Sequence, residues 1–412
     1  LFMPTVGEDV AFGPYNMGIR GEELQRVVDE ALTQVGMLEF RDRPPHHLSF
    51  GQRRRVAVAT VLAMKPEILV MDEPTSSLSE AETEALFELV NRLKASGISI
   101  VYISHRMAEI LKLCDRVTVM RDGETVMTAD CADLSVAQIV EAMLGAGNAT
   151  SFEWKDRQVP ATAKPVVQVR NLRLDKRIDD VSFDIKAGEI VGLAGLMGSG
   201  RTEIAETIFG RRRAVSGEVL FDGVPVANQA DAIARGIALV PEDRRKFGLV
   251  LDHSVRDNII LPNLERFTRH LFVQDAAALQ TVRDTIRDLA IKTDGPDKLS
   301  RLLSGGNQQK IVIGKWLARD PRLLILDEPT IGVDIGAKSE IVETVRAMAD
   351  RGMAVLVISS ELEELMAISD RILVLHGGRI AQDMNRRDVA TEEELHHAIQ
   401  GHSRPQAALG AA

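Results

Sequence analysis

The sequence predicts an α/β protein built from two copies of one domain, of which the first is incomplete. Motifs that repeat along the chain at a fixed spacing are the first observation behind this prediction. The second is that short apolar stretches, typical of buried strands, alternate with amphipathic stretches, typical of helices. The third is a glycine-rich loop between an expected strand and an expected helix, found at residues 195–202.

The repeat keeps one register along four pairs of segments. The offset between the copies is 303 − 48 = 255 residues throughout. The matched segments are 48–52 with 303–307, 68–75 with 323–330, 102–105 with 357–360 and 115–117 with 370–372. A register held without a gap over this length indicates a duplicated domain.

The two copies are unequal in length. Residues 166–250 of the second copy have no counterpart in the first, so we expect the first copy to begin part-way through its domain. The expected divisions are the later part of a first domain at 1–145, a linker at 146–164, a second domain at 165–402 and a tail at 403–412. Glycine, asparagine, threonine and proline in the linker are typical of a connecting segment.

Strands and helices are expected in alternation. The expected strands are 68–71, 98–103, 190–194, 237–240, 323–326 and 354–358. The expected helices are 22–35, 53–64, 80–95, 202–209, 308–318 and 337–350. Polar groups follow several of these strands directly, and open α/β sheets bind ligands at the carboxyl ends of their strands.

Composition narrows the class of protein. The formal net charge is −10, which disfavours a nucleic-acid partner, because phosphate contacts need lysine and arginine. The two cysteines, Cys114 and Cys131, form neither a disulfide framework nor a CxxC zinc motif, which fits a reducing compartment. No apolar run reaches the ~18 residues of a membrane span, and the N-terminus does not read as a signal peptide.

The glycine-rich loop is a candidate phosphate-binding loop. Its candidate ligand residues are Gly195, Gly198, Ser199, Gly200, Arg201 and Thr202. Glycines allow backbone N–H groups to converge on phosphate oxygens, and the following helix adds the positive end of its dipole. Thr202 is a candidate Mg²⁺ ligand, and Arg201 stands where such loops usually carry lysine. The alternative for this loop alone is a structural turn.

An Asp-Glu pair ends one apolar strand in each copy, Asp72-Glu73 in the first and Asp327-Glu328 in the second. Each aspartate is a candidate Mg²⁺ ligand. Each glutamate is a candidate catalytic residue that would orient or activate the attacking water. The alternative is that these carboxylates cap the helices that follow.

A Leu-Ser-x-Gly element precedes a helix in each copy. Its candidate nucleotide contacts are Ser49, Gly51 and Gln52 in the first copy, and Ser304, Gly305, Gly306 and Gln308 in the second. A hydroxyl and backbone N–H groups at a helix N-terminus can bind a γ-phosphate, although a capping box alone would use the same residues. His105 follows an expected strand and is a candidate catalytic contact to the γ-phosphate or to water, with a structural role as its alternative.

These motifs together resemble the ABC ATPase superfamily, chiefly through LSGGNQQK at 303–310 and LLILDEPT at 323–330. The resemblance covers nearly the whole chain. It implies two phosphate-loop nucleotide-binding domains in tandem, ATP and Mg²⁺ as cofactors, and hydrolysis of ATP to ADP and phosphate. It also implies head-to-tail pairing, in which the loop at 195–202 faces Ser49–Gln52 of the other half.

Further motifs resemble the fused double ATPases of bacterial monosaccharide importers. They are GLMGSGRTE at 195–203, VPEDRRKFGLVLDHSV at 240–255, ISSELEEL at 358–365 and YISHRMAEI at 102–110. This resemblance implies transmembrane permease subunits and a solute-binding protein as partners, and a peripheral location on the cytoplasmic face of the cell membrane. Residues 1–74 instead resemble ATPases of cobalt, nickel and vitamin importers, which indicates a chimera.

Several positions depart from the superfamily pattern and predict weak turnover. Arg201 replaces lysine, Glu242 stands where a glutamine that senses Mg²⁺ and water is usual, and Ser360 replaces histidine, while Glu328 is kept. We therefore expect nucleotide binding with little ATPase activity from this chain alone. The alternatives are a metal or vitamin importer, an ABC ATPase that transports nothing, and a non-catalytic nucleotide-binding regulator.

Overall fold

The computed structural model divides the chain into two compact units, unit 1 at residues 1–147 and unit 2 at residues 148–412. Each unit is described by itself. The structure describes residues 2–75, 78, 80–104, 106–121, 123–145, 154–157, 159, 162–175, 177–269 and 272–401. His105, the tail at 403–412 and much of the expected linker lie outside these ranges.

A six-stranded sheet forms the centre of unit 2, in the order β10-β13-β14-β7-β15-β16. Its strands are β7 (Ile190–Gly195), β10 (Ile237–Val240), β13 (Leu323–Asp327), β14 (Ala354–Ile358), β15 (Arg371–His376) and β16 (Arg379–Asn385). All neighbours are parallel except β15 and β16, which form an antiparallel hairpin. Because β13 and β14 are buried along their whole lengths, they read as continuous apolar runs in the sequence.

A second, antiparallel sheet is formed by strands from both sides of the phosphate-loop region in the chain. It has the order β6-β5-β8-β9, with β5 (Pro165–Arg173), β6 (Val181–Lys186), β8 (Ser216–Phe221) and β9 (Val224–Pro225). These strands, like the β15–β16 hairpin, are absent from the strands expected above. Their apolar residues alternate or form short mixed runs, as in the burial pattern of β6, so they lack the long apolar signal of the parallel strands.

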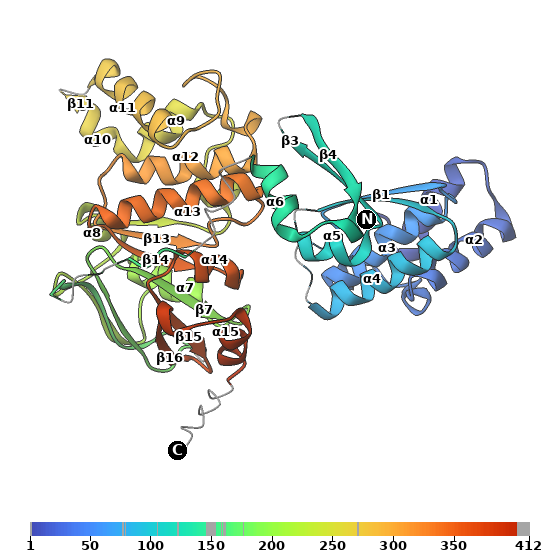
Figure 1. Cartoon of the computed structure of the whole chain (residues 1–412), viewed down its shortest axis with the longest axis horizontal. Helices are drawn as coiled ribbons and strands as arrows, with labels where there is room; N and C mark the ends of the chain where they lie inside the picture. The colour runs from blue at the N-terminus through green and yellow to red at the C-terminus, as the bar shows by residue number, and fades with distance from the viewer. Residues whose placement is uncertain are drawn as a thin grey trace. The chain divides into compact units, whose positions relative to one another are not determined.

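Helices cover the central sheet of unit 2 and form a separate segment at one end. The helices are α7 (Arg201–Ile208), α8 (Gln229–Ala234), α9 (Val255–Ile260), α10 (Leu264–Phe267), α11 (Asp275–Asp288), α12 (Gly305–Leu317), α13 (Ile335–Asp350), α14 (Leu362–Ile368) and α15 (Glu392–Ile399). A short hairpin of β11 (Thr268–Arg269) and β12 (Phe272–Val273) joins α10 to α11. Figure 1 shows α9, α10 and α11 (gold) together at one end of unit 2, with β15, β16 and α15 (red) at the other.

Residues 154–157, within the expected linker, belong to unit 2 and contact the rest of it. The Trp154 indole N–H donates to the carbonyl of Ser369 at 3.1 Å. Arg157 pairs with Asp370 at 2.7 Å, and the same carboxylate accepts from the backbone N–H of Ile190 at 2.8 Å. These contacts tie the segment to the first residue of β7.

Unit 1 contains two small sheets in place of one large sheet. A parallel pair is formed by β1 (Ile68–Asp72) and β2 (Ser99–Ile103), and an antiparallel hairpin by β3 (Arg116–Arg121) and β4 (Glu124–Asp130). The helices are α1 (Val6–Asn16), α2 (Gly21–Gln34), α3 (Phe50–Leu62), α4 (Glu80–Ala95), α5 (Met107–Leu113) and α6 (Val136–Leu144). At the repeat offset, β1 to β4 correspond to β13 to β16.

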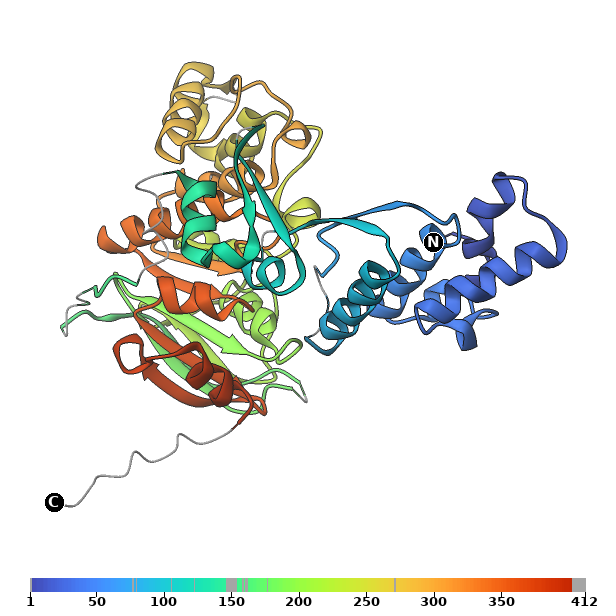
Figure 2. The same cartoon turned by 45° about the vertical axis from the view of Figure 1, so that its right-hand side comes forward.

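The β1–β2 pair is covered on one face only. In Figures 1 and 2 the helices α3 and α4 lie on one side of the pair. Leu69 and Met71 are buried on that side, whereas Val70 on the other side is 61% exposed. Its repeat partner in unit 2, Ile325, is fully buried. An apolar surface that unit 2 buries is therefore open in unit 1.

In the parts of the chain that the structure describes, no helix is both long enough and apolar enough to cross a membrane.

The difference in burial between repeat partners predicts different costs of truncation. Ile325→Ala should lower the free energy of unfolding by about 2–5 kcal/mol, because it leaves a cavity in the core of unit 2. Val70→Ala, the matched control, should change it by no more than about 0.5 kcal/mol, because Val70 is already largely exposed. Urea titration followed by circular dichroism measures both, and equal costs would contradict the comparison.

Candidate nucleotide-binding site

The phosphate-loop sequence connects β7 to α7 through a tight turn that requires glycine. Gly198 and Gly200 have φ of +76° and +105°. A Cβ on Gly200 would lie 2.6 Å from Ile178 Cδ1, so the Ile178 side chain would have to move, and a side chain at this φ would be strained. The loop thus packs against Ile178 and leads directly into α7. The N-terminal N–H groups and the dipole of this helix favour an anion.

Asp327 and Thr202 meet beside this loop. The Thr202 side chain lies close enough to the Asp327 carboxyl to act against the rise in its pKa that burial causes, and Asp327 is only 2% exposed. Burial raises the pKa of Asp327 to about 7. Its Oδ1 has no hydrogen-bond partner among the residues described, and a buried carboxylate oxygen without a partner fits a ligand such as Mg²⁺. The pair supplies two oxygen donors, and nucleotide phosphates and water would have to supply the others.

The glutamates that follow the two Asp-Glu strands share an unusual backbone conformation. Glu73 and Glu328 have φ of +43° and +48°, in the left-handed region that glutamate rarely adopts. In each unit the glutamate N–H donates to the last residue of the neighbouring strand, Ile103 at 2.9 Å or Ile358 at 2.8 Å. Strain retained at matched positions in both units is typical of functional turns.

Arg201 points toward Glu328 across the carboxyl ends of the strands. Its guanidinium Nη2 lies 3.4 Å from Glu328 Oε1, and Nη1 donates to the carbonyl of Ser359 at 2.7 Å. The Arg201 and Glu328 side chains are only 7% and 9% exposed. The residue expected to bind phosphate therefore forms a buried ion pair with the expected catalytic carboxylate.

Ser360 holds the other oxygen of the same carboxylate. Its backbone N–H and its hydroxyl donate to Glu328 Oε2 at 2.9 and 3.1 Å. Burial raises the pKa of Glu328, while the Ser360 N–H and Arg201 act in the opposite direction. The exposed Glu242 raises the pKa of Asp327 and Glu328 through its charge, so it lies close to both.

A fully buried glutamate connects the loop after β13 to the loop after β14. Glu364 is 1% exposed, and its Oε2 accepts from the hydroxyls of Thr330 at 3.0 Å and Ser359 at 2.6 Å. The Ser359 hydroxyl in turn accepts from the backbone N–H of Glu361 at 3.0 Å. This network fixes the segment whose carbonyl receives Arg201.

The same network recurs in unit 1. Glu109 Oε2 accepts from the hydroxyls of Thr75 at 2.8 Å, Tyr102 at 2.9 Å and Ser104 at 3.3 Å. Thr75, Ser104 and Glu109 lie 255 residues before Thr330, Ser359 and Glu364. The sequence analysis gave none of these three residues a role, although Thr75 and Ser104 lie in segments that recur at the repeat offset.

In the second Leu-Ser-x-Gly element, Ser304 is the N-cap residue of α12, but its side chain makes no hydrogen bond to the helix backbone. The Ser304 hydroxyl accepts from the side chain of Asn307 at 2.9 Å and makes no capping bond to the backbone. A Cβ on Gly305 or Gly306 would lie 2.5 Å from Gly332 O or Ala337 Cβ, so close packing requires both glycines. The buried side chain of Gln308 donates to the carbonyls of Ser300 and Leu303, each at 3.1 Å.

The first element forms a complete capping box. The Ser49 hydroxyl accepts from the Gln52 N–H at 3.2 Å, and the Gln52 side chain accepts from the Ser49 N–H at 2.9 Å. In unit 1 this element therefore acts as a helix cap. In this conformation the Ser49 and Gln52 side chains are both engaged in the capping hydrogen bonds.

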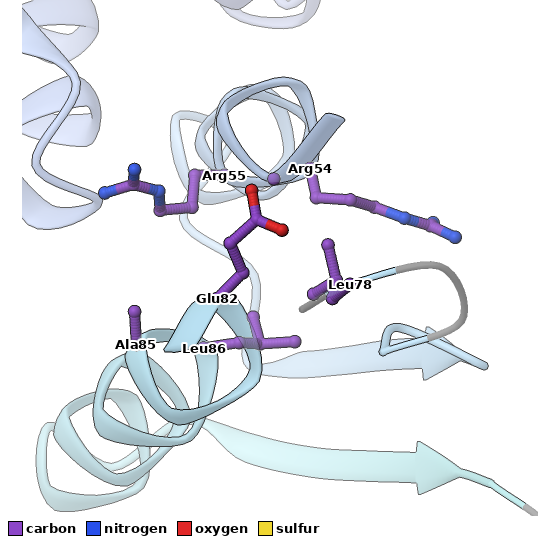
Figure 3. A pocket seen from close by; sticks show the side chains of 7 residues that line it. Arg54, Arg55, Leu78, Glu82, Ala85 and Leu86 are labelled. Carbon is purple, nitrogen blue, oxygen red and sulfur yellow. The ribbon is translucent and has the colours of Figure 1, made fainter. Parts of the chain in front are cut away.

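A cavity of 180 Å³ lies below the first element, between α3 and α4. It is lined by Gly51, Arg54, Arg55, Leu78, Glu82, Ala85 and Leu86. Figure 3 shows the Glu82 carboxylate directed from α4 toward α3. A Cβ on Gly51 would lie 2.2 Å from Glu82 Oε1, whereas Gly306 meets the methyl group of Ala337, the repeat partner of Glu82. The two units thus differ in charge beneath this element.

The remaining candidates of unit 1 have a more open environment. Asp72 is exposed at the end of β1, whereas its partner Asp327 is buried beside the phosphate loop. Glu73 is half-buried. His105 lies outside the described residues, so its proposed role stays a prediction.

A parallel α/β sheet with a phosphate loop after β7 and a buried Asp-Glu pair after β13 defines a phosphate-loop nucleotide-binding protein. The family model described as "ABC transporter" matches residues 4–76 and 178–331, which together exceed half of the chain. The chain belongs to the ABC transporter ATP-binding family.

Its relatives include "Ribose import ATP-binding protein RbsA" of Bacillus licheniformis, which is 40% identical over 379 residues, 92% of this chain and 76% of that protein. The protein of the same name from Halalkalibacterium halodurans is 39% identical over 398 residues, 96% of this chain and 79% of that protein. The solved structure of cbiO1 from Clostridium perfringens, part of the ABC transporter complex cbiONQ, is 22% identical. The match covers 57% of this chain and 94% of that chain with a TM-score of 0.49.

The buried position of Glu364 predicts a pH-dependent stability of unit 2. Burial raises the pKa of Glu364 from 4.5 to about 7, so the folded state holds a proton that the unfolded state releases between these values. The contribution of this group to stability is therefore full below pH 4.5 and is lost as pH rises through about 7. Glu364→Gln should raise the melting temperature relative to the native protein more at pH 8 than at pH 5. Thermal scans that give equal differences at the two pH values would contradict this.

Proposed function

We propose that the chain is the ATP-binding subunit of a bacterial ABC importer for monosaccharides of the ribose type. One observation carries the nucleotide part of this proposal: the glycine-rich turn between β7 and α7 lies beside the Thr202–Asp327 pair and Glu328. The substrate class is supported by the ribose import proteins that match more than nine-tenths of the chain.

A single family origin for both units is part of the proposal. The match to the Halalkalibacterium protein covers 96% of this chain, which leaves about 4% of its 412 residues outside the match. Most of the first 74 residues therefore align with a ribose import protein. This supports a sugar importer over the cobalt, nickel or vitamin importer that residues 1–74 resemble.

The partners proposed are transmembrane permease subunits and a solute-binding protein. In this role the chain lies at the cytoplasmic face of the cell membrane and attaches through the permease. The helical segments that precede the two signature helices, α1–α2 in unit 1 and α9–α11 in unit 2, are the proposed permease-docking elements. In unit 2 these helices lie between the phosphate loop and the signature helix α12, and in unit 1 α1–α2 precede the signature helix α3, which supports this assignment.

The proposed domains are 1–145 and 165–402, paired head to tail. In such a pair, the loop at 195–202 receives Ser49, Gly51 and Gln52 from the first domain. The reciprocal site combines Ser304, Gly305 and Gly306 with Asp72, Glu73 and His105. The recurrence of the signature and Asp-Glu elements at one offset supports equivalent positions in the two sites.

The proposed chemistry in unit 2 divides among four groups. Loop N–H groups bind phosphate oxygens, Thr202 and Asp327 hold Mg²⁺, and Glu328 accepts a proton from water. Mg²⁺, when bound, neutralises charge on the β- and γ-phosphates. The Glu328 carboxylate already accepts two hydrogen bonds from Ser360 and pairs with Arg201. These contacts stabilise its charged form, so it is a weaker acceptor for a proton from water. Slow turnover at this site follows from those contacts.

Magnesium-dependent binding tests the metal assignment. Thr202→Ala should weaken ATP binding at least about tenfold when Mg²⁺ is present and change it little when the metal is removed, because only a metal-held phosphate uses the hydroxyl. Equilibrium titration with a fluorescent ATP analogue measures both conditions. A Thr202→Ser control should keep most of the affinity, and equal loss with and without metal would reject Thr202 as a ligand.

Turnover tests the division of labour between the units. The full chain should bind ATP but hydrolyse it slowly. Adding a strand–phosphate loop–helix segment ahead of unit 1 should raise turnover at least about tenfold, because Asp72 and Glu73 would then adjoin bound phosphates. The same segment with its loop glycines changed to alanine is the control. Phosphate release at a full importer rate without any added segment would contradict the proposal.

A further inference from the structure

We propose that Arg201 is a specificity-determining residue, whose ion pair with Glu328 makes the site in unit 2 favour nucleoside diphosphates over triphosphates. The proposal rests on the assignment of the loop at 195–202 as the phosphate site and deepens it. The observation that carries it is the Arg201 guanidinium bound to Glu328 and to the Ser359 carbonyl, where a third phosphate would approach.

The Arg201 side chain does not occupy the loop N–H groups that would bind the first two phosphates. The Arg201 backbone opens α7, so its N–H remains among the groups that can bind phosphate oxygens. Its side chain leaves the loop and crosses to the ends of β13 and β14. Loop N–H groups can therefore hold two phosphates without any movement of the guanidinium.

The third phosphate differs because it must reach Glu328. A glutamate that activates water must lie within a hydrogen bond, or one water, of the reacting centre. The surroundings of the Glu328 carboxylate are therefore where the γ-phosphate and its water belong. The guanidinium now lies at this carboxylate, with both side chains more than nine-tenths buried.

The two groups that bind the Arg201 guanidinium, the Glu328 carboxylate and the Ser359 carbonyl, are fixed by further hydrogen bonds. Ser360 donates twice to Glu328 Oε2, and Glu364 holds the Ser359 hydroxyl at 2.6 Å. Thr330 completes this support through Glu364 at 3.0 Å. With its receptors fixed in this way, the long arginine side chain is the part that must move when a triphosphate binds.

The cost of that movement depends on burial. Separating a buried ion pair leaves two charges to be compensated, so the γ-phosphate must replace Glu328 as the partner of Arg201 while it approaches the Glu328 charge. A diphosphate bound at the loop N–H groups meets neither cost. The triphosphate therefore loses affinity relative to the diphosphate for as long as the Arg201–Glu328 pair exists.

A double-mutant cycle isolates this cost from simple repulsion between Glu328 and the γ-phosphate. The variants of the full chain are Glu328→Gln, Arg201→Met and the double variant; glutamine keeps the shape of glutamate, and methionine keeps an apolar stem. For each, titration with fluorescent ADP and with a fluorescent, non-hydrolysable ATP analogue gives a triphosphate-to-diphosphate affinity ratio. Repulsion alone contributes equally whether arginine or methionine occupies the position, so only the pair produces coupling.

We expect Glu328→Gln to raise the affinity ratio about tenfold more with Arg201 present than in the Arg201→Met protein. The native ratio should favour the diphosphate. Arg256→Ala is the matched control, because it removes a different arginine ion pair, with Asp275, and should leave the ratio unchanged. Additive effects of the two substitutions would overturn the proposal while leaving nucleotide binding intact.

Two further outcomes are decisive. If the native chain binds neither nucleotide, the proposed function and this inference both fail. If it binds nucleotide but the two substitutions are additive, only this inference fails. If Arg201→Met does not fold, as judged by circular dichroism, Arg201→Lys replaces it in the cycle. The shorter ammonium lacks the planar fork that reaches both Glu328 and Ser359, so coupling should fall at least about threefold. Coupling as large as that of arginine would overturn the assignment of the guanidinium.

Discussion

The position of β7 in the middle of the central sheet is the constraint on which the rest of unit 2 depends. It pairs with β14 on one side and β15 on the other, so one strand joins both halves of the sheet and ends in the phosphate loop. Unit 2 accordingly has one continuous apolar core. Unit 1 has no counterpart of β7 among the residues described, and its apolar residues form two separate cores, one around β1 and one around β3.

The chemistry of the site follows from the same arrangement. Because β13, β7 and β14 end at one edge, Asp327, Arg201 and Ser359 meet although they lie far apart in the sequence. Parallel strands supply buried positions for carboxylates, and buried carboxylates need partners. Arg201 and Ser360 meet that need for Glu328. The side chains of the site thus hold one another in place, and Glu328, the proposed catalytic carboxylate, is held by two of them.

Sequence reasoning predicted most of the parallel strands, the glycine-rich loop and the helices after the Leu-Ser-x-Gly elements, because continuous apolar runs, glycines and a fixed repeat leave direct signals, but it did not predict β15. It missed the antiparallel sheet of β5, β6, β8 and β9, whose partly exposed strands have weaker patterns. It assigned Arg201 to phosphate without anticipating Glu328, because a side chain's direction depends on packing that no motif records. Glu364 was missed for a similar reason: its role comes from burial and from hydroxyls on two other segments.

The open face and free edges of β1 and β2 have a consequence for the behaviour of the chain in solution. Within the described residues of unit 1 these strands pair only with each other, and each presents backbone N–H and C=O groups along its outer edge. Val70 and Val101 add apolar surface beside those edges. Exposed, apolar strand edges act as templates for another chain. Self-association of this protein should therefore begin in unit 1, where exposed apolar side chains lie beside these strand edges.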